Sequence, residues 1–235
     1  IGTNLDIVDR VGDAPLSVAN SQSYNMIPSN ISPYVPGYVG NQIANNFSMT
    51  FDGTNYFGAG NDSSLQITGN ITLSAWINTT QTTNGWIIAK DDASNRNYAL
   101  LVANVSGTMR ARFYIVKSGT VTPVTSTTIN VGDGNWHHVV GVNDGTDIKI
   151  YVDGNLESTN SGGGGTIDND TVNLEIGRRG DNQFFFNGSI DEVAIFDTAL
   201  NAGQIFNDLY QPTSTATNKT ADLVNNPNLP NPVAW

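Results

Sequence analysis

Residues 136–154 read WHHVVGVNDGTDIKIYVDG, and this stretch holds two alternating apolar patterns around a turn. Trp136, Val140 and Val142 share one face of residues 136–142 with His138, and apolar side chains occupy every second position over 148–152. A period of two with one apolar face predicts a half-buried strand, because successive side chains in a strand point to opposite faces. Asp144-Gly145 between the two patterns is typical of a tight turn. The stretch therefore predicts an antiparallel hairpin.

The same alternation recurs along the middle of the chain. It is clear over residues 71–77 and 109–115, and Asp-Gly, Asn-Gly and Gly-Asp-Gly turn signals separate the strand patterns from one another. Short strands joined by such turns favour two packed antiparallel sheets over alternating βαβ units. The predicted fold class is therefore all-β, a two-sheet antiparallel sandwich.

One short helix is expected near the C-terminal end of this strand region, over residues 201–210. Asn201 has a side chain that can cap the first turn. Ile205, Phe206 and Leu209 follow the helical period and predict a buried stripe.

The composition restricts the function classes. The chain has 10 Lys+Arg against 21 Asp+Glu, a net charge of -11, which argues against a nucleic-acid-binding surface because such surfaces are strongly basic. It has no cysteine and only two histidines, which excludes disulfides, thiolate chemistry and a His-rich metal site. No apolar run of about 18 residues is present, so no membrane span is expected.

Three regions are expected along the chain. Residues 1–46 form an irregular N-terminal arm with edge strand pieces, because the segment 26–40 contains three prolines and two glycines. Residues 47–210 form the sandwich. Residues 211–235 are rich in Pro, Asn and Thr and predict an extended linker.

Several segments, in this order and at this spacing, carry a family resemblance. They are FDGTNY (51–56), ITLSAWI (71–77), WHHVVGV (136–142), KIYVDG (149–154) and FNGSIDEVAIF (186–196). Together they resemble the laminin G-like, concanavalin A-like jelly-roll family, in the tandem-repeat type found in phage and bacterial surface proteins. The resemblance implies a jelly-roll sandwich. It also makes the C-terminal Pro-Val-Ala-Trp (232–235) similar to the opening strand of a next repeat.

The resemblance further implies a structural Ca²⁺ ion. Its ligands would be the carboxylates of Asp52 and Asp191 with backbone carbonyls near Gly53 and Asn55, since calcium takes six to eight hard oxygen ligands. The alternative is that Asp52 only makes an Asx-turn and Asp191 only a hydrogen bond at a strand end.

The carboxylate array expected of a glycoside hydrolase is missing. The three glutamates, Glu157, Glu175 and Glu192, are far apart in the sequence, whereas glycoside hydrolysis needs two carboxyl groups about 5–10 Å apart. His137 and His138 are adjacent on a predicted strand, point to opposite faces and cannot chelate one ion together. We therefore expect no enzyme. The resemblance implies a structural, packing role for the histidines, with Trp136 in the core.

Two polar loops supply the candidate ligand-binding residues. Sugar recognition uses aromatic faces together with planar polar groups, and the segment 178–186 offers both. The alternative interpretation is that its Phe run belongs to the core, although alternation leaves at least one of these rings facing away. The segment 90–97 is the second exposed polar turn. The candidates are Arg178, Asn182, Gln183, Phe184, Asp91 and Arg96.

These observations lead to a functional expectation. The leading one is a non-catalytic binding or adhesion module of a surface or virion protein, which recognises a glycan or a surface protein through its edge loops. The alternative is a structural subunit of a capsid, fibre or filament that self-assembles through its terminal arms, because open sheet edges allow strand addition. A glycoside hydrolase is the third and least favoured class. The expected location is extracellular, at a cell surface or on a virion.

Overall fold

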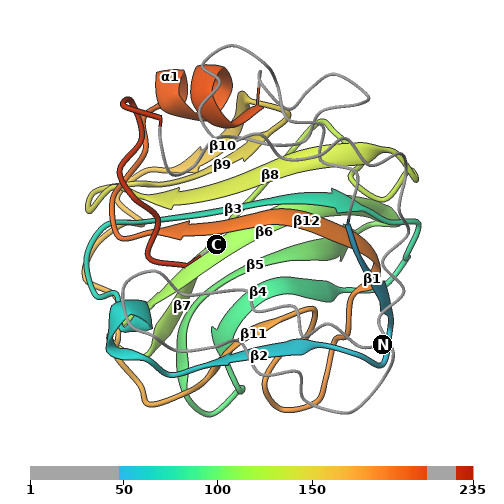
Figure 1. The fold of residues 1–235 in the computed structure, drawn as a ribbon, viewed down its shortest axis with the longest axis horizontal. Helices are drawn as coiled ribbons and strands as arrows, with labels where there is room; N and C mark the ends of the chain where they lie inside the picture. Colours follow the sequence, from blue (N-terminus) through green and yellow to red (C-terminus); the bar gives the residue numbers. More distant parts are fainter. Residues whose placement is uncertain (1–47, 211–225, 235) are drawn as a thin grey trace, which may run out of the picture.

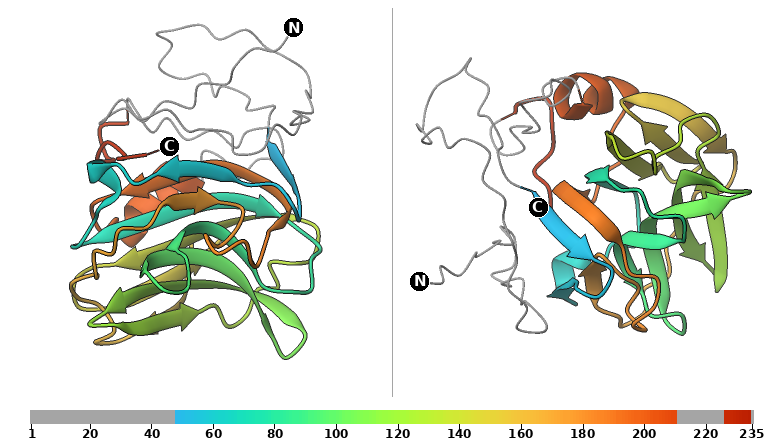
Figure 2. Two further views of the ribbon diagram at one scale, coloured as in Figure 1. Left: turned by 90° about the horizontal axis from the view of Figure 1, so that it is seen from below. Right: turned by 90° about the vertical axis from the view of Figure 1, so that its right-hand side faces the viewer.

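The computed structural model describes residues 48–210 and 226–234 of the 235-residue chain. In these residues, two six-stranded antiparallel sheets pack face to face, which confirms the predicted sandwich (Figures 1 and 2). The arm predicted for residues 1–46 lies outside the described residues, as does the first part of the predicted linker. Across the described ranges, no helix is long and apolar enough to cross a bilayer.

The first sheet, here the β3 sheet, has the strand order β1-β12-β3-β8-β9-β10. Its strands are β1 (Met49–Asp52), β12 (Asn187–Phe196), β3 (Ile71–Asn78), β8 (Trp136–Asn143), β9 (Ile148–Val152) and β10 (Asn155–Asn160). The second sheet, the β5 sheet, has the order β2-β11-β4-β5-β6-β7. Its strands are β2 (Phe57–Gly60), β11 (Leu174–Ile176), β4 (Gly85–Asp91), β5 (Arg96–Val105), β6 (Thr108–Lys117) and β7 (Thr120–Thr125).

The hairpin predicted for residues 136–154 forms as β8 and β9, in antiparallel register from Asn143 opposite Ile148. The turn depends on Asp144, whose carboxylate accepts hydrogen bonds from the backbone N–H groups of Thr146 and Asp147 at 3.0 and 2.8 Å. Gly145 has a φ of +89°, which a residue with a Cβ adopts only at a cost. The Asp-Gly pair therefore sets the turn, as the sequence predicts.

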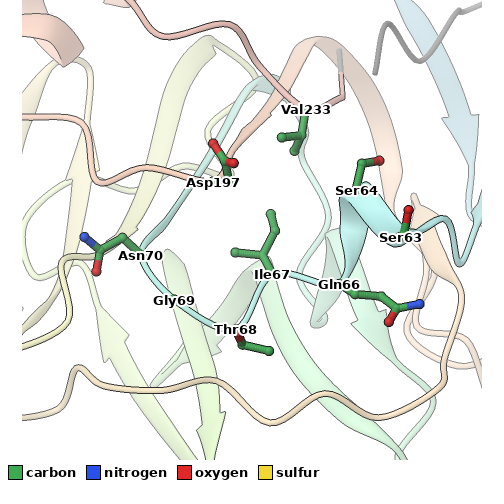
Figure 3. Close-up of a pocket in the computed structure, with 9 residues that line it drawn as sticks. All are labelled: Ser63, Ser64, Gln66, Ile67, Thr68, Gly69, Asn70, Asp197 and Val233. Atoms are coloured by element: carbon green, nitrogen blue, oxygen red, sulfur yellow. The ribbon is translucent and has the colours of Figure 1, made fainter. Parts of the chain in front are cut away.

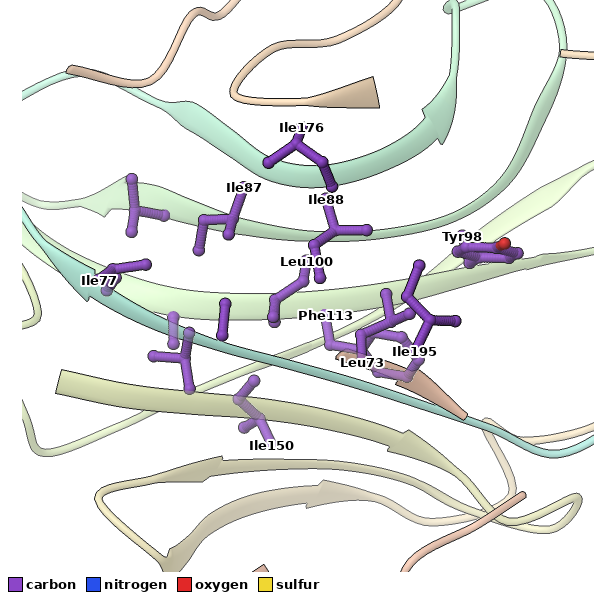
Figure 4. Close-up of a cluster of buried hydrophobic side chains, with 14 of the residues drawn as sticks. Leu73, Ile77, Ile87, Ile88, Tyr98, Leu100, Phe113, Ile150, Ile176 and Ile195 are labelled. Atoms are coloured by element: carbon purple, nitrogen blue, oxygen red, sulfur yellow. The ribbon is translucent and has the colours of Figure 1, made fainter. Parts of the chain in front are cut away.

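The main core lies between the two sheets. Leu73, Ile77 and Ile150 from the β3 sheet meet Leu100 and Phe113 from the β5 sheet, and all five are fully buried (Figure 4). Leu73, Ile77, Phe113 and Ile150 occupy positions of the predicted alternating patterns, whereas Leu100 lies in a strand that the sequence analysis did not predict. Burial of their apolar surface is the main term that holds the sheets together.

The prediction that the strands are half-buried is wrong for the centre of the β3 sheet. Seven of the eight residues of β3 are buried, and so are seven of the eight in β8. The reason is a third layer on the outer face of this sheet. There Ile205, Leu209 and Leu229 form a second apolar cluster with Val140 and Phe196.

The third layer begins with the predicted helix. Asn201 caps it as expected: its side chain accepts from the N–H of Gln204 at 3.0 Å, and the side chain of Gln204 accepts in return from the N–H of Asn201. A single α-turn, α1 (Ala202–Gln204), continues into a π-helical turn, η2 (Ile205–Tyr210).

The predicted buried stripe of this helix is correct at two positions and wrong at the third. Ile205 and Leu209 are buried, but Phe206 is 38% exposed. The wider π-helical turn changes the spacing of side chains around the axis. Phe206 instead lies beside Tyr210, with ring centroids 5.9 Å apart.

Residues 226–234 are not the extended linker that the sequence predicts. The N–H of Val233 donates to the carbonyl of Ile195 at 2.8 Å, and the N–H of Ile195 donates to the carbonyl of Ala234 at 2.9 Å. Leu229 and Val233 are buried. Apolar side chains and the edge of β12 that is left free beyond its pairing with β1 therefore hold this segment on the sandwich itself (Figure 1).

Candidate ligand-binding site

The structure brings the two predicted polar loops together, although they are far apart in the sequence. The N–H of Gly180 donates to the carbonyl of Asp91 at 2.8 Å, and the N–H of Trp86 donates to the carbonyl of Phe184 at 3.0 Å. The segment 178–186 is thereby fixed against β4 and the turn that follows it. The two loops form one surface, which we call the Phe184 site.

Two residues of the segment 90–97 are buried rather than exposed, which corrects the sequence prediction. Lys90 and Asp91 still belong to β4. The Nζ atom of Lys90 donates to Asn61 Oδ1 and to the carbonyl of Val172, both at 2.6 Å, and burial lowers the pKa of Lys90 to about 8. Lys90 therefore belongs to the interior and not to a ligand site.

Asp91 is 1% exposed and anchors the turn instead of facing a ligand. Its carboxylate accepts from the N–H of Ala93 at 2.6 Å and from the Tyr114 hydroxyl, and it lies 3.5 Å from Nε of Arg96. Burial and the Asp91 charge raise the pKa of Tyr114, which keeps that hydroxyl a neutral donor. Arg96 remains one-third exposed beside this network.

Arg178 is likewise buried, at 6% exposure, which contradicts the prediction that it faces a ligand. Its guanidinium makes two hydrogen bonds to Glu175, of 2.6 and 3.0 Å, and one to the side-chain oxygen of Asn182. Its Cζ atom lies 3.2 Å from the centre of the Tyr56 ring. A bidentate pair with a ring above it fixes a side chain firmly, so Arg178 positions the loop.

Arg179 is the functional candidate that the sequence prediction missed. Its guanidinium pairs with Asp181 at 2.9 and 2.6 Å and lies 4.5 Å from the Phe184 ring centre and 5.4 Å from that of Trp86. The Asp181 hydrogen bond raises the pKa of Arg179, and Arg179 lowers the pKa of Asp181. Arg179, Gly180 and Asp181 are consecutive in the sequence, and this short separation of opposite charges is the signal that could have indicated the pair.

Phe184 is the exposed aromatic of the site. It is 38% exposed, whereas Phe186 is fully buried, which confirms that one ring of the Phe run faces away from the core. Phe184 has a φ of +55° and Asn182 a φ of +60°, an uncommon backbone state for residues with side chains. Such states persist only where surrounding structure imposes them, and they cluster at ligand-binding segments.

The Phe184 ring rests on an aromatic base on the outer face of the β5 sheet. Its centroid lies 4.7 Å from that of Trp86, whose Nε1 atom is 3.3 Å from the Tyr114 hydroxyl. Trp86 and Tyr114 belong to a third apolar cluster, which also contains Ala89 and Ala99. Asn182 and Gln183 are exposed on the adjoining backbone. The site therefore offers a supported ring beside two amides and one ion pair.

The structure does not bring the predicted calcium ligands together. In the β1–β12 ladder, Asp52 lies opposite Asn187, which is four residues from Asp191, or about 13 Å along the strand. Asp52 Oδ1 accepts from the N–H groups of Thr54 and Asn55, at 2.8 and 3.2 Å. This is the alternative Asx-turn, and the hydrogen bonds from Thr54 lower the pKa of Asp52. The four predicted residues do not fit one calcium site in this arrangement.

The other predicted ligands of that ion have local roles as well. Gly53 has the left-handed φ of +83° that the Asx-turn needs, and the side chain of Asn55 accepts from the N–H of Asp52 at 3.0 Å. Asp191 accepts from the N–H of Glu192 at 2.9 Å, within a β-bulge that breaks the strand alternation. Among residues 48–210 and 226–234, no three His, Asp or Glu side chains form a group that could hold a metal ion.

The histidines point to opposite faces of β8, as predicted. His137 lies between two carboxylates, 2.8 Å from Asp153 and 3.1 Å from Asp133. His138 lies 2.9 Å from the Ser74 hydroxyl, on the face that carries Trp76 and Tyr210. Trp136 is half-buried rather than part of the core, because it opens the strand at the sheet end.

The three glutamates lie on three separate strands, Glu157 on β10, Glu175 on β11 and Glu192 on β12. Glu157 accepts from the N–H of Thr128 at 2.8 Å, and Glu175 pairs with Arg178. The sequence prediction contained no paired glutamates, and the structure places none of these three on a common strand.

Comparison with known proteins agrees with the fold. The Laminin_G_3 family model, described as the concanavalin A-like lectin/glucanases superfamily, matches residues 51–206. The chain belongs to this superfamily. A relative is the adhesion G-protein coupled receptor V1 of Danio rerio, 30% identical over 159 residues, which cover 64% of the chain and 2% of the receptor.

Two solved structures share the superfamily fold. One is the binding domain of Paraclostridial mosquitocidal protein 1, with a TM-score of 0.61 and 14% identity, over 86% of this chain and 48% of that one. The other is domain 4 of AbnA, a GH43 extracellular arabinanase from Geobacillus stearothermophilus, in complex with arabinotriose. It has a TM-score of 0.59 and 16% identity, over 86% of this chain and 92% of that domain.

Proposed function

We propose that the chain is a non-catalytic glycan-binding module of an extracellular surface or virion protein, and that it binds through the Phe184 site. The observation that carries this proposal is the exposed Phe184 ring, held in a left-handed backbone state beside the amides of Asn182 and Gln183. An aromatic face stacks on the C–H face of a sugar ring. Amide groups donate to and accept from its hydroxyls.

The supporting network explains why such a site can be pre-organised. Arg178 fixes one side of the loop through Glu175, and the carbonyl of Phe184 accepts from Trp86 on the other side. A loop that is already ordered loses little conformational entropy when it binds. The Arg179–Asp181 pair adds charged hydrogen-bonding groups at the edge of the ring.

The comparisons support a binding role of this kind. One matched structure is the binding domain of a mosquitocidal protein, and another was solved with arabinotriose. The matched relative is named an adhesion receptor. A binding module also agrees with the separation of the three glutamates over three strands.

The test uses a glycan array followed by titration of the best ligand. We expect Phe184→Ala to weaken binding by about tenfold or more, because stacking and desolvation of one ring contribute on the order of 1.5 kcal/mol. The matched control is Phe206→Ala, which removes an equally exposed Phe on the helix layer. Equal affinities for the wild type and Phe184→Ala, or a selective loss in Phe206→Ala, would contradict the Phe184 site.

A second candidate function is a structural subunit, and one observation favours it. The segment around Val233 and Ala234 adds to the edge of β12 through backbone hydrogen bonds, which a copy of the same segment from a neighbouring chain could make equally well. The pairing within one chain needs no partner and is our preferred arrangement.

A further inference from the structure

A second concave site lies away from the Phe184 site. It is a pocket of about 350 Å³ between the 3-10 turn η1 (Ser63–Leu65), the segment 66–70, the end of β12 and the C-terminal segment (Figure 3). Phe184 precedes β12 and Asp197 follows it. The ten residues of that strand therefore separate the two sites by roughly 30 Å.

The pocket combines an apolar middle with a polar rim. Ile67 and Val233 point toward one another across it, and Asp197 lies beside them (Figure 3). Ile67 and Val233 are both buried, whereas Asp197 is exposed. Hydroxyl and amide side chains, including those of Ser64 and Gln66, complete the rim.

Long-range hydrogen bonds fix the loop that forms the floor. The Tyr98 hydroxyl donates to the carbonyl of Leu65 at 2.8 Å, and the N–H of Ile167 donates to that of Thr68 at 2.8 Å. The side chain of Asn143 donates to the carbonyl of Gly69 at 3.0 Å. These partners come from three other parts of the sandwich, so the loop keeps one shape and the pocket is formed in advance.

We infer that this pocket binds one sugar ring or another compact neutral polyol. The Ile67–Val233 pair fits the C–H face of such a ring, and the Asp197 carboxylate accepts hydrogen bonds from its hydroxyls. Among the described residues that line the pocket there is one carboxylate and no lysine or arginine, which disfavours an anionic ligand. The volume lies at the lower end of the range for ligand pockets, about 300–1,000 Å³, and so suits a single ring.

The pocket also couples its ligand to the C-terminal segment. Val233 forms one wall, and its N–H is bonded to the carbonyl of Ile195 in β12. A ligand that packs against Val233 binds only while the segment is docked, and by linkage it stabilises the docked state. Occupation of the pocket therefore slows hydrogen exchange at the Val233 amide.

The experiment titrates the full 235-residue chain with a panel of free monosaccharides and alditols, followed by ligand-observed NMR and amide hydrogen exchange. We expect a member of the panel to bind and to slow exchange at Val233. We expect Asp197→Ala to weaken its binding about tenfold or more, since the carboxylate is exposed and its removal leaves the fold intact. Val233→Phe fills the pocket and serves as a second variant that blocks binding.

Phe206→Ala, which removes an exposed Phe that lines neither site, is the control and leaves monosaccharide binding unchanged. Three results would each overturn the proposed sugar site in the pocket. They are no binding from the panel, binding that Asp197→Ala and Val233→Phe leave unchanged, and unaltered hydrogen exchange at Val233. A sugar lost with Phe184→Ala but kept with Asp197→Ala overturns the pocket and supports the proposed function. If no glycan of the array binds but a monosaccharide of the panel does, the Phe184 site is contradicted and the pocket is supported.

Discussion

At the scale of single residues, two neighbouring histidines have opposite electrostatic environments. Burial alone lowers the pKa of His137, but its hydrogen bonds to Asp153 and Asp133 outweigh this effect and raise it above the ordinary value. Burial lowers the pKa of His138 to about 4, and the charge of Asp153 offsets this only in part. Strand alternation places the two rings in these different surroundings.

The two shifts predict opposite dependences of stability on pH. For His138, the folded pKa lies below the unfolded value of about 6.5. His138 therefore does not lower the folding stability above pH 6.5, and it lowers this stability increasingly as the pH falls toward 4. For His137, the folded pKa is raised, so its contribution is fully present below about pH 6.5 and is lost as pH rises through the folded pKa.

His138→Gln is expected to remove most of the acid-side loss of stability between pH 6.5 and 4, which amounts to about 3 kcal/mol at most. The measurement is urea denaturation at intervals of pH, and the slope against pH is the readout rather than the absolute stability. His137→Gln serves as the control, because it should leave the acid-side slope in place. An identical acid-side slope in His138→Gln and wild type would contradict the prediction.

Asp52 provides a second test at this scale. Asp52→Ala is expected to lower the free energy of unfolding by about 1 kcal/mol, because the Asx-turn loses its acceptor. We expect the same loss in calcium and in chelator, measured by thermal unfolding. The predicted calcium site requires a different pattern, in which chelator destabilises the wild type and has no effect on the variant.

At the scale of elements, the loop 178–186 shows how one buried ion pair can position a surface site. Arg178 and Arg179 are consecutive, yet the first is enclosed with Glu175 and Tyr56, while the second forms a partly exposed pair with Asp181. Breaking a buried pair leaves a charge without its partner, and this cost falls as water reaches the pair.

Arg178→Ala is therefore expected to cost about 3 kcal/mol of stability and to weaken glycan binding, because the loop loses its anchor. Arg179→Ala, the neighbouring control, should cost less than Arg178→Ala, because water reaches the Arg179–Asp181 pair more readily. Chemical denaturation of both variants measures the difference. Equal costs for the two variants would show that Arg178 does not hold the loop.

At the scale of the whole molecule, the C-terminal segment 226–234 covers part of the β3 sheet that would otherwise be open to other chains. Leu229 packs in the outer cluster of the β3 sheet, and Val233 bonds to the edge of β12. An edge that the chain covers itself is withdrawn from pairing with other molecules.

Deleting residues 226–235 is expected to lower the melting temperature by several degrees, since it exposes apolar side chains and the β12 edge. We expect the intact chain to be a monomer by light scattering and the shortened chain to associate more readily. A structural subunit that exchanges this segment would behave in the reverse way, associating when intact and dissociating when shortened.

The sequence predicts much of the fold because many strands, turns and caps are determined by residues that are neighbours in the chain. The hairpin of residues 136–154, the Asn201 cap and the alternation of Leu73 and Ile77 depend on neighbours in the chain. The candidate site is predicted less well. Phe184, Asn182 and Gln183 are exposed as expected, but Arg178 and Asp91 are buried, because burial depends on segments distant in the sequence.

By itself, the sequence determined that the chain is an antiparallel sandwich with tight Asp-Gly turns and one capped helix. The period of two and the turn residues act through the backbone next to them, so they operate before any sheet has formed. Only the tertiary structure decided which segments, distant in the sequence, lie next to each other. It joined the loops around Phe184, separated Asp52 from Asp191 and placed residues 226–234 on β12. These outcomes depend on strand order and register, which arise from packing across the whole molecule.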